Sequence, residues 1–173
     1  MSCIIDSGYV LDCFSTGGVE RVWLATWAEA NEYTFDADEV IIGAVVDPAQ
    51  LYYVIEQDVE YAGLEQTITN SRENGTSFFE TNVSLKFTNL DKELRNLIKS
   101  MAKAPMALIV KANTGEYFYC GVESAGRVTE GVASLGVALG DLNGATVTVN
   151  FRSSNGVYLL DGALIGTDFP VAP

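Results

Sequence analysis

Alternating apolar and polar residues predict β-strands in two segments of the chain. In residues 79–87, Val83 and Leu85 share one face with Thr81, whereas polar and charged side chains occupy the other face. Residues 145–151 alternate in the same way. Further runs rich in strand-forming residues lie at 19–25, 52–56, 64–69, 107–111, 117–120, 132–139 and 157–160.

Turn-forming residues join several of these strands into hairpins. Residues 70–76 are polar and contain the turn signal Asn74-Gly75, so we expect a long hairpin that projects from the body. The segments 113–115 and 140–144 predict two more turns. The apolar run 39–46 indicates either one strand buried on both faces or two short strands bent at Gly43.

One segment has helical spacing instead. Thr88, Asn89 and Asp91 supply capping groups, and Pro105 stops the continuation. Because the apolar stripe between them is narrow, we expect a helix over about residues 90–103 that lies on a sheet rather than inside it. The stripe consists of Leu90, Leu94, Leu97, Ile98 and Met101.

This order of elements predicts a mainly β fold, an antiparallel β-sandwich or barrel with one flanking α-helix and a projecting hairpin. We expect residues 1–161 to form a single domain with an N-terminal arm over about residues 1–18. Two prolines in the last four residues suggest that residues 162–173 are a loose or docking C-terminal arm.

Composition limits the partners of this fold. With 48% hydrophobic residues, the 173-residue chain fills a core, and its net charge of −13 disfavours binding to nucleic acid and to anionic membranes. No apolar run approaches the roughly 20 residues of a membrane span, and the first residues show no secretory signal. We therefore expect the protein to be made in a cytoplasm.

The sequence offers little for catalysis. It contains no histidine, which removes the usual catalytic triads and the commonest metal ligand. Cys3, Cys13 and Cys120 form no CxxC pair and indicate free thiols, and the segment 36–39 indicates a polar turn because it lacks the glycine and distal glutamate of a calcium loop. We expect no enzyme activity, no cofactor and no metal, with most aromatic residues in the core rather than on a carbohydrate-binding face.

Charge is unevenly distributed along the chain. The segment 86–111 holds six of the ten basic residues and only two acidic ones, so it carries +4 while the rest carries −17. Within the expected helix, the basic residues recur every three or four positions and form one stripe. The stripe is either a solvated face or a surface that meets an acidic face of a neighbouring copy. Its members are Lys92, Arg95, Lys99 and Lys103.

Four motifs give the chain a resemblance to known proteins. They are Cys3-Ile4…Gly8…Asp12-Cys13 followed by Gly17-Gly18-Val19 and Val22-Trp23-Leu24-Ala25; Glu73-Asn74-Gly75-Thr76-Ser77-Phe78-Phe79-Glu80; Gly115-x-Tyr117-Phe118-x-x-Gly121; and Gly140-Asp141-Leu142-Asn143-Gly144-x-Thr146-Val147-Thr148. In these the chain resembles virion structural proteins of tailed bacteriophages, especially those of Bacteroidetes hosts. It departs from that pattern at Leu142, where a basic residue is more usual, and beyond Phe151.

The resemblance, together with the expected layout, implies a tail-tube subunit. Such subunits form stacked hexameric rings, so the implied location is the virion, assembled in the host cytoplasm, with an acidic lumen through which double-stranded DNA passes without specific binding. Other tail or head-completion proteins are the implied partners, and Arg72, Glu73 and Asn74 in the hairpin are implied contacts between subunits. A head–tail connector, a capsid decoration protein, a baseplate component and a β-sandwich module that binds glycan or protein remain as alternatives.

Overall fold

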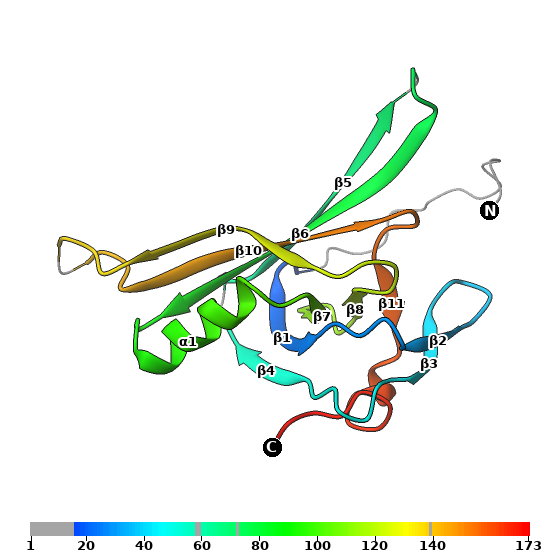
Figure 1. Cartoon of the computed structure of the whole chain (residues 1–173), viewed down its shortest axis with the longest axis horizontal. Coiled ribbons are helices and arrows are strands. Elements are labelled where there is room, and N and C mark those ends of the chain that lie inside the picture. Colours follow the sequence, from blue (N-terminus) through cyan, green and yellow to red (C-terminus); the bar gives the residue numbers. More distant parts are fainter. Residues whose placement is uncertain (1–15, 58–59, 72, 139) are drawn as a thin grey trace.

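The computed structural model describes residues 16–57, 60–71, 73–138 and 140–173, and within them the chain is mainly β with one α-helix (Figure 1). The expected N-terminal arm lies largely outside the described residues, as do Cys3, Cys13 and Arg72. The strands are β1 (Val19–Thr26), β2 (Glu32–Phe35), β3 (Ile41–Val45), β4 (Tyr53–Glu56), β5 (Gly63–Ser71), β6 (Thr76–Thr88), β7 (Met106–Ala112), β8 (Tyr117–Cys120), β9 (Arg127–Ser134), β10 (Gly144–Ser153) and β11 (Tyr158–Leu160).

These strands form two sheets that pack face to face. The larger sheet has the order β2-β3-β11-β8-β7-β1-β4, and the smaller one has the order β5-β6-β10-β9. All neighbouring strands are antiparallel except β3 and β11. The predicted mainly β sandwich with a flanking helix is therefore confirmed.

The main core lies between the two sheets, because each sheet turns one face of alternating apolar side chains inward. Val22 and Leu108 come from the larger sheet, and Val83, Val147 and Val149 come from the smaller one. A second core covers the outer face of the larger sheet, where Trp23, Ile109, Tyr119 and Phe169 are buried. Strand β7 is therefore buried on both faces, as expected for a central strand.

The C-terminal segment is docked on its own domain, which excludes the loose arm of the two expected alternatives. Residues 162–173 fold back onto the larger sheet, where the Phe169 side chain is fully buried and its ring centroid lies 5.4 Å from those of both Tyr52 and Tyr119. The backbone N–H of Tyr52 donates to the carbonyl of Pro170, and that of Ala172 donates to the carbonyl of Tyr52. The segment is a part of the domain and not a loose arm, because an aromatic anchor and backbone pairing outweigh its prolines.

Helix α1 (Lys92–Met101) closes one end of the sandwich. The Asp91 side chain caps it by accepting a 2.8 Å hydrogen bond from the backbone N–H of Leu94. Its first residue is Lys92 rather than residue 90, because Asn89 adopts a left-handed conformation with φ 65° and Asp91 is extended. It ends at Met101, so Lys103 follows the helix instead of lying within it. The buried Leu94 and Met101 hold the helix at the sandwich.

Three other details differ from the sequence prediction. Strand β3 lies next to an edge strand, so Ile42 and Val45 are exposed and the run 39–46 is neither fully buried nor split in two. Strand β9 begins earlier than the predicted run 132–139, and residues 135–138 belong to the loop that follows it. Strand β2, which no alternating pattern indicated, pairs with β3 as a hairpin.

Candidate functional site

The buried polar groups of the larger sheet form a structural network. The Tyr119 hydroxyl lies 2.8 Å from that of Tyr33 and 3.1 Å from that of Tyr52, and Gln50 donates to the Tyr52 hydroxyl. Burial raises the pKa of all three phenols, so they stay protonated at neutral pH. This network connects β2 and the segment before β4 to β8, and it presents no ionised group to a substrate.

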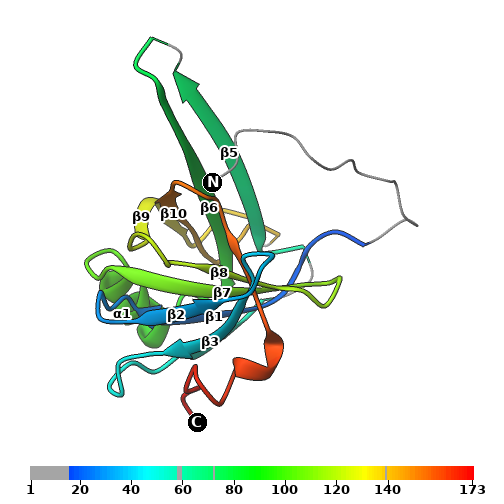
Figure 2. The same cartoon turned by 90° about the vertical axis from the view of Figure 1, so that its right-hand side faces the viewer.

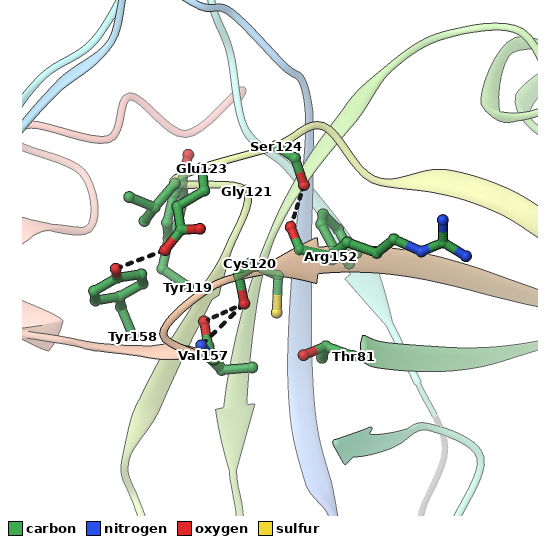
Figure 3. A pocket seen from close by; sticks show the side chains of 13 residues that line it. Thr81, Tyr119, Cys120, Gly121, Glu123, Ser124, Arg152, Val157 and Tyr158 are labelled. Carbon is green, nitrogen blue, oxygen red and sulfur yellow. Dashed lines mark hydrogen bonds between the residues drawn. The ribbon is translucent and has the colours of Figure 1, made fainter. Parts of the chain in front are cut away.

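A small polar cavity lies where β8 and β10 end (Figure 3). Glu123 accepts hydrogen bonds from the Ser154 backbone N–H at 2.6 Å and from the Tyr158 hydroxyl at 3.0 Å. Burial alone would raise the pKa of Glu123, but the hydrogen bonds from Ser154 and Tyr158 outweigh it and hold the pKa below its ordinary value. With a volume of 10 Å³, the cavity has room for about one water molecule and none for a substrate.

The residues considered for metal binding lie in a loop, and the described cysteine, Cys120, lies in the core. The Asp36 carboxylate accepts hydrogen bonds from the backbone N–H groups of Asp38 and Val40, each at 2.9 Å, which makes residues 36–39 a polar turn as predicted. No cluster of three or more potential metal-ligating side chains occurs in the part of the chain that the structure describes. Cys120 is buried and unpaired, and burial raises its pKa to about 12.

The basic stripe, which consists of three residues of α1 and of Lys103 just after it, is exposed to solvent. Lys92, Arg95, Lys99 and Lys103 are all exposed, and among the described residues none of them pairs with a carboxylate. The two ion pairs found there, Lys111 with Glu20 and Arg152 with Glu80, lie elsewhere. The stripe is therefore an uncompensated positive surface at one end of the molecule.

The opposite end of the molecule is acidic. Strands β2 and β3, at the far edge of the larger sheet from α1, lie at the other end of the long axis (Figure 1). Exposed carboxylates gather on these strands and their loops, namely Glu32, Asp36, Asp38, Glu39 and Asp47. The charge segregation seen along the sequence thus becomes a separation in space.

The predicted long hairpin is present and stands out from the body (Figure 2). Strands β5 and β6 stay paired as far as Ser71 and Thr76, and the exposed Glu73 and Asn74 occupy the turn. The hairpin tip is distant from α1, so the structure does not bring the two predicted sets of contact residues together within one copy.

The two outer strands of the smaller sheet were not singled out from the sequence as a candidate contact surface. Strands β5 and β9 lack a neighbour on one side among the described residues, and most of their side chains are exposed. Ile68 on β5, Val132 on β9, and Leu135 and Val137 in the loop after β9 are large apolar residues with 59% to 103% exposure. One sequence signal could have indicated that these strands are open edges: they contain apolar residues but no proline or lysine, and proline and lysine commonly protect the edge of a sheet.

The helix of the described chain is too short and too polar to cross a membrane. A comparison of the sequence with models of known protein families and with curated proteins gave no significant match.

Proposed function

We propose that this protein is a structural subunit that assembles with copies of itself, and that the assembly is the tail tube of a bacteriophage. The observation that carries the proposal is the smaller sheet, which has two long uncovered edges. Such edges are templates for strand pairing, and monomeric proteins usually shield them. Here the nine residues of β5 and the eight of β9 lack proline and lysine, and their only charged residues are Glu65 on β5 and Arg127 and Glu130 on β9.

The strand count of this sheet suits a ring. With four strands that are all antiparallel, β5 and β9 run in opposite directions. When copies are related by rotation, β9 of one copy meets β5 of the next as an antiparallel pair, so the sheet continues without a break. Six copies would close a barrel of 24 strands, about 45–50 Å across at ordinary strand spacing and tilt. Such a barrel admits a DNA double helix.

The lining of that barrel differs from the acidic wall that the sequence suggested. The outer face of the smaller sheet carries mainly hydroxyl and amide side chains, with three acidic and three basic residues: Glu65, Glu80, Glu130, Lys86, Arg127 and Arg152. If this face lines the channel, the wall is polar with balanced charge. It offers no excess of cations to hold phosphates, which serves DNA passage.

The charged ends of the molecule suit the stacking of rings. Strands β9 and β10 of the smaller sheet run along the long axis, which joins the basic α1 end to the acidic β2–β3 end, and the β5–β6 hairpin rises at an angle to it (Figure 1). In a ring with these strands along its axis, the two ends face the rings above and below. Opposite charges then meet between successive rings and fix their orientation. The projecting hairpin extends from the same body toward a neighbouring subunit.

Electron microscopy of the purified protein tests the proposal. We expect negative-stain images of the concentrated protein to show rings or tubes, and sedimentation to show species much heavier than the 18.6 kDa chain. A monomer that persists at high concentration and at every salt concentration would refute self-assembly. The symmetry and length of the particles separate a tube from a connector, a capsid decoration or a baseplate part.

The structure gives less support to a glycan-binding module. Trp23 is buried, and Trp27 is partly buried with its indole N–H donating to the Gly121 carbonyl at 2.8 Å. Neither ring therefore belongs to an exposed aromatic platform.

A further inference from the structure

An apolar cleft lies between helix α1 and the edge strand β9, and it has no occupant in the single copy. Its volume is 290 Å³. Ile98 and Ala102 line it from the helix, and Val128, Gly131 and Ala133 line it from β9. These β9 residues pair with the buried Val149, Val147 and Ala145 of β10, so they lie on the core-facing side of the sheet.

The cleft is open because three of the residues that line it have small side chains or none. A side chain added at Gly131 would meet its nearest atoms only at 4.0 Å, and Ala102 and Ala133 extend no further than one methyl group. Since β9 is the last strand of the sheet, nothing beyond it covers this side among the described residues. An apolar surface of this kind at a sheet edge is suited to a further strand that brings its own core-facing side chains.

Strand β5 carries such side chains at the other edge of the same sheet. Ile68 pairs with Phe79, two residues from Thr81 and four from Val83, and both of these are buried. Ile68 therefore lies on the core-facing side. Unlike them, it extends beyond the sandwich along the hairpin and is 59% exposed.

We propose that β5 of a second copy pairs with β9 and places its Ile68 in the cleft between β9 and α1. This inference rests on the proposed self-assembly and specifies its lateral contact. If Leu64 of the second copy pairs with Ala133, then Gln66 of the second copy lies opposite Gly131. Ile68 of the second copy then lies opposite Val128, because β9 has an irregularity where it pairs with Thr148 and Val149 of β10. Core-facing residues then meet core-facing residues along the whole contact, as strand pairing requires.

The two edges of the smaller sheet favour a second copy as the occupant. Strand β9 ends the sheet on one side with the apolar cleft on its core-facing side, and β5 ends it on the other side with the exposed Ile68 on the same core-facing side. Because β5 and β9 run in opposite directions, β5 of a copy related by rotation meets β9 as an antiparallel strand. The acidic Glu65 and Glu80 lie on the opposite face of the sheet from the cleft, so the affinity of the contact comes from the strand pairing and the buried isoleucine.

Two neighbouring substitutions on β5 test this placement. Ile68→Glu puts a carboxylate into the cleft, whereas Thr69→Glu puts the same group on the opposite face of the same edge strand, where Thr69 is exposed. We expect Ile68→Glu to weaken association by about 100-fold or more, because an unpaired carboxylate replaces a buried apolar group. We expect Thr69→Glu to assemble within a few-fold of wild type. Sedimentation equilibrium measures both, and circular dichroism confirms that each monomer is folded.

Gly131→Leu tests the same contact from the side of β9. The added side chain fills the cleft of its own copy, so we expect loss of assembly with an unchanged or higher melting temperature. If wild type assembles and Ile68→Glu assembles equally well, or if Thr69→Glu is as damaging as Ile68→Glu, the placement of Ile68 is refuted while self-assembly stands. If wild type does not assemble, both proposals fail.

Discussion

Removing the Phe169 side chain tests whether the C-terminal segment belongs to the domain. Phe169 is fully buried, and its ring packs against Tyr52 and Tyr119 at 5.4 Å between centroids. Phe169→Ala removes that burial and leaves a cavity that the surrounding strands fill only in part. Substitutions of this type cost about 3–5 kcal/mol.

A loss of this size is easily measured. For a domain of 150–250 residues, each kcal/mol lowers the melting temperature by about 2–4 °C, so we expect a decrease of about 6–20 °C. Urea denaturation followed by circular dichroism gives the free energy of unfolding directly. Val45→Ala serves as the control, because Val45 is 70% exposed and its truncation should change the stability by less than about 0.5 kcal/mol.

The outcome separates two accounts of the C-terminal segment. If residues 162–173 were an arm that docks only on another copy, Phe169→Ala would leave the isolated monomer as stable as wild type. A decrease below about 1 kcal/mol would therefore refute the internal packing described here.

Three further predictions concern charge, thiol chemistry and pH. Lys99→Glu combined with Lys103→Glu reverses half of the basic stripe, so we expect sedimentation to show reduced assembly of a folded monomer, most strongly at low salt; unchanged assembly would leave the stripe as a solvated surface. Because burial raises the pKa of Cys120 to about 12, we expect this thiol to react with Ellman's reagent at pH 8 only after unfolding, and rapid reaction of the native protein would contradict its burial. Burial raises the pKa of Glu123, but the hydrogen bonds from Ser154 and Tyr158 outweigh this effect, so the folded protein has a lower Glu123 pKa than the unfolded chain. The ionised Glu123 therefore stabilises the fold fully above the unfolded pKa near 4.5, and this stabilisation is lost as the pH falls through the folded pKa. We expect Glu123→Gln to reduce the acid sensitivity of the free energy of unfolding, and an unchanged pH profile would contradict this expectation.

Much of the fold was predictable because the signals for its strands, turns and helix start lie within a few neighbouring residues. The alternation in β6 and β10, the Asn-Gly turn of the long hairpin and the capping group Asp91 all act over a few residues. Strand β2 was not predicted, because Glu32, Thr34 and Phe35 are exposed and the strand therefore has no alternating pattern of buried residues. The packing of Phe169 was not predicted either, since its partners Tyr52 and Tyr119 are distant in sequence.

The proposed contact surfaces were only partly predictable from the sequence, for a related reason. The spacing of Lys92, Arg95 and Lys99 on one helix reveals the basic stripe directly. By contrast, the sequence does not show which strands are outermost, because the order β5-β6-β10-β9 depends on long-range pairing. In the sequence, Ile68 looks like an ordinary strand residue. The structure shows that it lies on the core-facing side of β5 in the part of the hairpin that extends beyond the sandwich, so it is exposed.

If the protein assembles as proposed, the even number of strands in the smaller sheet has a consequence for how the polymer grows. In the proposed ring, a contact between unlike edges leaves every subunit pointing the same way, so the two faces of the ring differ, one with the basic α1 helices and one with the acidic strands β2 and β3. A stack of such rings has polarity, and its two tips present different chemistry. Nucleation and capping factors can then each recognise one tip, which lets length be controlled without any change in the subunit.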